Sequence, residues 1–125
     1  MPHKTEDYKT WVKAITALFI LVILEEGAAH GNKINEKIKC RTGRMLAPNP
    51  NVLYPLLRAM EEKGYIAGNW DNASTRNKRV YAITANGRSC IPALRQKVKR
   101  HLNVAEQKLK MIRGNLLDSV QEEKQ

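Results

Sequence analysis

Hydrophobic residues recur every three or four positions near the start of the chain. Trp11, Ile15 and Phe19 lie on one such stripe within residues 8–26, and this spacing predicts an amphipathic helix. Most of the intervening positions are apolar as well. A helix that is apolar nearly all round must be covered on more than one side. In a chain of this size a second subunit can provide part of that cover, and Gly27 is placed to end the helix.

A second, shorter helix is predicted over residues 31–42. Ile34 and Ile38 are spaced to face inward, while Lys33 and Lys37 face outward. Glycine and two prolines follow directly and break the helix.

The next helical pattern lies in NVLYPLLRAMEEKGYI, residues 51–66. Leu53 and Leu57 fall on the face that should meet the core. Arg58 falls on the opposite face, with Tyr54 on its flank. This helix therefore combines a packing face with an exposed polar face.

Pro55 lies inside that pattern, and a proline in a helix interior costs about 3 kcal/mol because it lacks a backbone N–H. In the first turn of a helix this N–H has no partner in any case. We therefore expect the helix to begin near Asn49 or Asn51, with an asparagine as N-cap and Pro55 about one turn in. The exposed amino end of such a helix favours phosphate, and DNA-reading helices usually contact bases with this end.

Two short strands are predicted over residues 65–71 and 78–84, joined by a polar linker. The tip and exit of the linker carry three cations, Arg76, Lys78 and Arg79. Cations at the tip of a two-stranded wing are suited to phosphates or a minor groove, although each can also be merely solvated.

The last predicted helix runs from about residue 85 to residue 120, with Thr84 as N-cap. Its apolar positions recur nearly as a heptad seam. They are Ile91, Leu94, Val98, Leu102, Ala105, Leu109, Ile112 and Leu116. A long apolar stripe at the end of a small domain has little core to cover in its own chain, so we predict self-association, with packing within the monomer as the alternative.

Length and charge limit the class of protein. The 125 residues suffice for one domain with one modest core. The net charge of +10 attracts polyanions such as DNA, RNA and anionic membranes. Residues 1–29 hold three Lys or Arg against four Asp or Glu, so the positive excess lies in the rest of the chain. This distribution is typical of a directed binding face, with a solvated basic surface as the plain alternative.

Other classes of site find little support. Cys40 and Cys90 are far apart without a CxxC pattern, which favours two free thiols over a disulfide. The histidines are scattered, so we expect no metal and no other cofactor. No catalytic triad pattern or Gly-rich phosphate loop appears, and we predict no enzyme activity. The apolar run at residues 14–24 is too short to span a bilayer and no signal peptide is evident, so we expect a cytoplasmic protein.

The order of predicted elements is helix, helix, helix, two strands, long helix. It indicates an α+β fold, mostly α: a winged helix-turn-helix with a two-stranded wing and a long C-terminal dimerisation helix. We assign residues 1–85 to the winged-helix DNA-binding domain and residues 86–125 to the dimerisation helix, both parts of one compact unit.

Three stretches stand in register within this order: LYPLL at residues 53–57, EEKGYI at 61–66 and YAITANG at 81–87. Together they resemble the PadR-type regulators, a family named for a repressor of phenolic acid stress genes, over roughly residues 15–90. The resemblance implies a dimeric transcription factor, usually a repressor, whose second and third helices and wing bind a palindromic operator. It also implies that the C-terminal helix packs against the first helix of the partner. The short tail resembles the small subfamily with one terminal helix.

The chain departs from the family pattern at Asn32, where the family commonly has tyrosine, and at Val52, where it tends to have threonine. Both changes put the particular operator sequence in doubt. Some members of the small subfamily bind flat aromatic drugs between stacked tryptophans of the dimer helices. Residues 86–125 contain no aromatic residue, so the sequence names no small-molecule effector.

From the residues and the resemblance we predict two sets of contacts. The DNA-binding set is Lys33, Lys37, Asn49, Asn51, Tyr54, Arg58, Arg76, Lys78 and Arg79. The dimer-interface set is Trp11, Ile15, Phe19, Ile91, Leu94, Val98, Leu102, Leu109, Ile112 and Leu116. For two members a local role is the alternative: Tyr54 can pack beside Leu57, and Arg58 can pair with Glu61 or Glu62.

The function predicted from the sequence is a homodimeric, sequence-specific DNA-binding transcriptional regulator, a repressor acting on a palindromic operator in double-stranded DNA. The alternative is an architectural protein that binds DNA or RNA with the same basic face without reading sequence. A weaker third reading is a protein-interaction adaptor built on the long helix.

Overall fold

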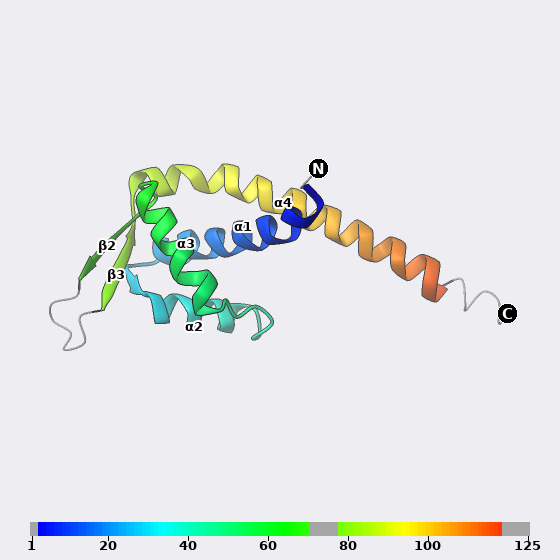
Figure 1. Cartoon of the computed structure of the whole chain (residues 1–125), viewed down its shortest axis with the longest axis horizontal. Helices are drawn as coiled ribbons and strands as arrows, with labels where there is room; N and C mark the ends of the chain where they lie inside the picture. The colour runs from blue at the N-terminus through cyan, green and yellow to red at the C-terminus, as the bar shows by residue number, and fades with distance from the viewer. Residues whose placement is uncertain (1–2, 71–77, 119–125) are drawn as a thin grey trace.

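The structure is a computed structural model that describes residues 3–70 and 78–118. Its elements, in chain order, are α1 (His3–Glu25), β1 (Ala29–His30), α2 (Gly31–Arg41), α3 (Pro50–Glu62), β2 (Ile66–Trp70), β3 (Arg79–Ile83), α4 (Ala85–Arg113) and a π-helical turn (Gly114–Asp118). The architecture is mostly helical with a small sheet and a long C-terminal helix, as the sequence predicts (Figure 1).

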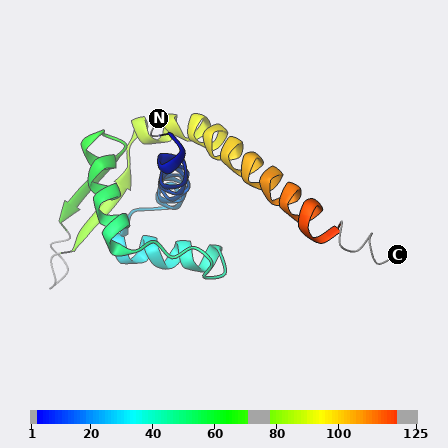
Figure 2. The same ribbon diagram turned by 45° about the vertical axis from the view of Figure 1, so that its right-hand side comes forward.

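The core is built around α1, which lies between α4 on one side and α2 with α3 on the other (Figures 1 and 2). Ile20 and Ile23 of α1 are fully buried, together with Ile34 of α2 and Leu57 of α3. The apolar surface of α1 is thus buried largely within its own chain. Within the described residues, no helix has the length and apolarity needed to cross a bilayer.

The sheet is antiparallel with the strand order β1-β3-β2. Strand β3 pairs with β2 to form the wing, and its Tyr81 is buried in the core. The third strand, β1, was not predicted. It has only two residues, Ala29 and His30, paired with Tyr81 and Val80, and a pair of residues shows no period from which a strand can be inferred.

Helix α3 begins as predicted, with an asparagine cap. Asn49 has extended backbone geometry, and its Oδ1 accepts the Asn51 N–H at 2.8 Å. The helix starts at Pro50, so Pro55 is its sixth residue and lies just past the first turn. Its missing N–H leaves the carbonyl of Asn51 without a helical donor. Because Asn51 is exposed, water can solvate that carbonyl, and the cost of the proline stays small.

Helix α4 is capped by Thr84, whose Oγ1 accepts the Gly87 N–H at 3.0 Å. This confirms the predicted cap. The α-helix ends at Arg113 and continues as the π-helical turn to Asp118, while the predicted end at residue 120 lies outside the described residues. The first half of α4 packs along α1, and the second half extends beyond the rest of the described chain (Figures 1 and 2).

Candidate nucleic-acid interface

A groove of about 760 Å³ lies between α3, the start of α2 and the wing. We call it the α3–wing groove. It brings together four of the nine residues predicted to bind DNA: Tyr54, Arg58, Lys78 and Arg79. Three cations and an aromatic ring, distant in sequence, therefore border one concave surface.

The amino end of α3 is open to solvent beside this groove. Asn49, Asn51, Val52 and Pro55 are all exposed. The cap uses the Oδ1 atom of Asn49, whereas the Asn51 side chain has no hydrogen bond to another described residue. A helix end with unpaired N–H groups favours an anion. This surface has the chemistry expected of a helix that approaches a duplex end-on.

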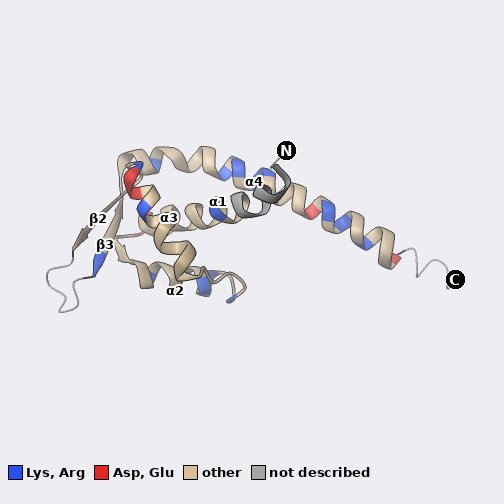
Figure 3. Cartoon of the chain, in the orientation of Figure 1, with Lys and Arg blue, Asp and Glu red and all other residues tan. Residues whose placement is uncertain are grey.

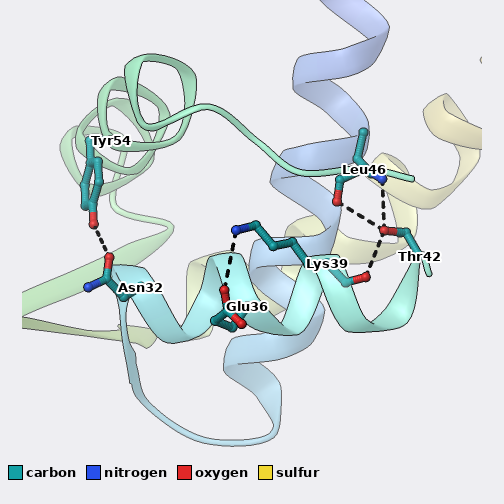
Figure 4. Close-up of polar contacts among 6 residues, drawn as sticks. All are labelled: Asn32, Glu36, Lys39, Thr42, Leu46 and Tyr54. Carbon is teal, nitrogen blue, oxygen red and sulfur yellow. Dashed lines mark hydrogen bonds and ion pairs between the residues drawn. The ribbon is translucent and has the colours of Figure 1, made fainter. Parts of the chain in front are cut away.

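Tyr54 connects α3 to the start of α2. Its ring is half-buried against the core, and its hydroxyl donates to Oδ1 of Asn32 at 3.0 Å (Figure 4). Gly31 makes room for the ring, since a Cβ atom there would lie 2.7 Å from Cε1 of Tyr54. Tyr54 thus combines the packing role that the sequence left open with a polar atom at the groove.

The turn between α2 and α3 is closed by Thr42. Its hydroxyl donates to the Ile38 carbonyl at 2.8 Å and accepts the Leu46 N–H at 3.1 Å. Figure 4 shows this hydroxyl between the end of α2 and the segment that leads to α3. These bonds fix the direction in which the chain approaches Asn49, and hence the position of the amino end of α3.

The two predicted lysines of α2 differ in their surroundings. Lys33 is exposed, and no ion pair joins it to another described residue. Lys37 Nζ lies 3.7 Å from Oε1 of Glu26, which also accepts a hydrogen bond from Arg41 Nη2. The hydrogen bond from Arg41, with the charges of Arg41 and Lys37, lowers the pKa of the Glu26 carboxyl below its ordinary value. Lys33 is therefore the freer of the two cations.

The cations of α3 and the wing also differ. Arg58 is exposed and pairs with neither Glu61 nor Glu62 in the described structure; Glu61 pairs with Arg79 instead. Lys78 is half-buried and borders the groove. Arg76 lies outside the described residues.

A comparison of the sequence with known protein families gives the same fold. The sequence profile of the transcriptional regulator PadR-like family matches residues 20–93 of the chain. The chain belongs to the PadR-like family of transcriptional regulators. The match spans α2, α3 and both strands of the wing, which are the elements that border the α3–wing groove.

Solved structures show the same PadR-like fold. A PadR-like transcription factor from Bacteroides fragilis has a TM-score of 0.63 at 23% identity, over 82% of this chain and 96% of that one. A transcriptional regulator from Clostridium thermocellum has a TM-score of 0.61 at 22% identity, over 80% and 91%. Bacillus subtilis PadR, solved in complex with operator DNA, has a TM-score of 0.57 at 22% identity, over 63% and 45%. A comparison with curated proteins found no match.

Sequence reasoning missed several groove residues of this PadR-like protein. Trp70 was not among the predicted DNA-binding residues, yet it is 59% exposed at the end of β2 and borders the groove. Asn32 was noted as a departure from the family, and the structure shows that it binds Tyr54. For Trp70 the signal was its place at a strand end. For Asn32 no local signal existed, because its partner is 22 positions away.

The predicted dimer residues fall into two groups. Trp11, Ile15 and Phe19 of α1 are half-buried. Ile91 and Val98 of α4 are 3% and 7% exposed within the single chain. The sequence assigned these two side chains to a partner subunit, but they belong to the first half of α4, which packs along α1 of its own chain.

The second half of the predicted seam is open. Leu102, Leu109, Ile112 and Leu116 are between 43% and 65% exposed. Leu94, between the buried Ile91 and Val98, is half-buried and packs against the core. At 100° per residue these four side chains continue the same helical line that begins with the buried residues. One stripe therefore runs from the core onto the extended end of α4.

Positive charge is less focused than the sequence suggested. Lys and Arg occur on α2, α3 and β3, but also along α4 (Figure 3). Helix α4 lies on the other side of α1 from α2 (Figures 1 and 2), and none of its residues borders the groove. The positive charge beyond residue 30 thus belongs to more than one surface.

Proposed function

We propose that this PadR-like protein is a cytoplasmic, homodimeric repressor that binds a palindromic DNA operator in a sequence-specific manner. The observation that carries the proposal is the exposed amino end of α3 beside the α3–wing groove. The fold resembles that of Bacillus subtilis PadR, a protein whose structure contains operator DNA.

In this proposal the amino end of α3 enters the major groove. Asn51 is the candidate base reader, since asparagine can pair with the edge of adenine. Lys33, Arg58 and Lys78 neutralise phosphates, which fixes the register of the protein but carries no sequence information. Asn49 contributes mainly by capping α3.

The open half of α4 supports the dimer. Its four exposed side chains, Leu102, Leu109, Ile112 and Leu116, have a near-heptad spacing. A sustained apolar stripe on a helix that no other element of its chain covers is typical of a helix that packs against another one. The half-buried face of α1 that carries Trp11, Ile15 and Phe19 is a second apolar surface that a partner can cover.

Equilibrium binding to two duplexes tests the proposal. We expect DNA from upstream of the protein's own gene to bind roughly 10³-fold more tightly than random duplex. Asn51→Ala should reduce this preference. Lys33→Ala should instead weaken binding to both duplexes equally and reduce the slope of log K against log salt concentration by about one. Asn103→Ala, on α4, is the control and should change neither.

The cations along α4 favour a second candidate function, an architectural DNA- or RNA-binding protein. Such a protein needs an extended basic surface and no base reading. It would bind both duplexes with similar affinity, and Asn51→Ala would then have no effect on the ratio. That result would replace the first proposal with the second.

A further inference from the structure

Arg79 is the predicted DNA-binding cation whose surroundings differ most from those of a free surface charge. Its Nη2 atom donates to Oε2 of Glu61 at 2.5 Å and to the carbonyl of Gly68 at 3.0 Å. The same Oε2 atom accepts the Gly68 N–H at 3.2 Å. A side chain of α3 and a side chain of β3 thus close a ring of hydrogen bonds through the backbone of β2. We call it the Glu61–Arg79 brace.

The absence of a side chain at Gly68 makes room for the brace. A Cβ atom there would lie 2.5 Å from Nη2 and 3.0 Å from Nε of Arg79. Two rings also border the guanidinium, whose Cζ lies 5.3 Å from the centroid of Trp70 and 5.9 Å from that of Tyr81. Cation–π attraction to both rings adds to the hydrogen bonds. The guanidinium is therefore held over β2.

These contacts leave Arg79 poorly placed to bind a phosphate. Glu61 and Arg79 are each 30% exposed, so water screens their attraction only in part. A phosphate would have to displace a carboxylate that is already in place. Arg58 and Lys78 border the same groove and pair with no acidic residue in the described part of the chain. Of the described cations that border the groove, these two remain available to DNA.

We propose that Glu61 is a positioning residue that fixes the wing against α3 through Arg79 and Gly68, and that Arg79 does not itself contact DNA. The proposal rests on the proposed DNA-binding function. The brace sets the distance between Lys78, directly before β3, and the amino end of α3. Loosening the brace lowers the affinity for DNA because the wing is misplaced, while every phosphate contact is kept.

Adjacent carboxylates provide a matched test on DNA. Glu61→Gln and Glu62→Gln remove the same charge from neighbouring positions that both border the groove. We expect Glu61→Gln to weaken duplex binding roughly tenfold, with an unchanged slope of log K against log salt concentration. Glu62→Gln should bind as the wild type does or slightly more tightly. Arg79→Ala should resemble Glu61→Gln in both affinity and slope.

The opposite pattern would overturn the proposal. If Glu61 merely restrained an arginine that contacts DNA, Glu61→Gln would free the guanidinium and tighten binding. Arg79→Ala would then reduce the salt slope by about one unit, as the loss of a phosphate contact does. Tighter binding by Glu61→Gln, or a reduced slope in Arg79→Ala, therefore rejects the positioning role of Glu61.

Trp70 allows a second test that needs no DNA. The chain has two tryptophans, so a Trp11→Phe background leaves Trp70 as the only indole emitter. Glu61→Gln and Gly68→Ala should each shift its emission, and the double variant should shift it no further than one of them alone. Glu62→Gln should leave it unchanged.

Unchanged Trp70 emission in Glu61→Gln would reject the brace even if DNA binding falls. Should the wild-type protein bind no duplex, the proposed function fails on its own account. The fluorescence measurement then still decides whether the brace exists.

Discussion

At the scale of single residues, Tyr54 depends on two neighbours in α2. Gly31 leaves space for its ring, and Asn32 accepts a hydrogen bond from its hydroxyl. Tyr54 itself stands one turn into α3, beside the exposed amino end. The position of a groove side chain is thus set by residues that need no contact with DNA.

This dependence predicts the effect of Gly31→Ala. The added Cβ displaces the Tyr54 ring and breaks its bond to Asn32, so we expect a loss of about 1–3 kcal/mol in the free energy of unfolding. Urea denaturation measures that loss. Gly114→Ala is the control, because nothing lies within 4 Å of a Cβ at that position. Equal stability of Gly31→Ala and the wild type would show that the ring has room to move.

The exposure of side chains was predicted better than their hydrogen-bond and ion-pair partners. The sequence placed Tyr54 and Arg58 on the exposed side of α3, and the structure leaves Tyr54 half-buried at the groove and Arg58 exposed. It did not predict that Arg79 would pair with Glu61, 18 positions away. Local spacing indicates which way a side chain points from its element, whereas a partner on another element depends on the packing of both.

At the scale of elements, the hydrophobic period predicted the four α-helices in the described part of the chain, and capping residues predicted where α3 and α4 begin. Period sufficed because each helix has buried positions at helical spacing, such as Leu53 and Leu57 in α3. Capping sufficed because Asn49 and Thr84 act within their own turns. Strand β1 was missed because it is defined only by its pairing with β3.

The cap of α3 gives a prediction at this scale. Asn49→Ala should lower the free energy of unfolding by about 1 kcal/mol, whereas Asn49→Ser should preserve most of it, because serine also caps. Asn51→Ala should leave stability unchanged, since its side chain makes no cap. Thermal or urea denaturation checks all three. A full loss of DNA affinity in Asn49→Ser, at unchanged stability, would instead make Asn49 a base reader.

The contact between the ends of α1 and α2 predicts a dependence on pH. Arg41 and Lys37 lower the pKa of Glu26 in the folded state, so its carboxylate stabilises the fold above the ordinary pKa of glutamate. That contribution is lost as the pH falls through the lowered folded value. Glu26→Gln should thus be less stable than the wild type at pH about 7, and the difference should narrow by pH about 3.

Urea denaturation at both pH values measures this difference. Glu25→Gln is the matched control, since Glu25 is an exposed neighbour with no ion pair among the described residues. A gap between Glu26→Gln and the wild type that stays constant with pH would contradict the prediction.

At the scale of the whole molecule, the two halves of α4 have different surroundings. Its first half contributes Ile91 and Val98 to the core of its own chain. Its second half carries the same apolar stripe out beyond the domain. The sequence showed one continuous seam and could not show where it leaves the core, because that point depends on where α1 begins to pack.

The extended half of α4 predicts the oligomeric state. Leu102→Lys combined with Leu109→Lys should give a folded monomer with weaker operator binding, because charge on the stripe opposes helix packing. Sedimentation measures the mass. Asn103→Lys with Gln107→Lys adds the same charge to the opposite side of the helix and should leave the dimer intact. A dimer that survives the leucine changes would place the interface elsewhere.

In the proposed complex, two copies of the protein present the amino ends of their α3 helices to one duplex. Cross-linking the protein to DNA in its own cells and sequencing the captured fragments tests this most directly. We expect an inverted repeat whose half-site centres are about one helical turn, roughly 10 base pairs, or a multiple of it apart. Fragments that share no motif, or a motif without two-fold symmetry, would contradict it.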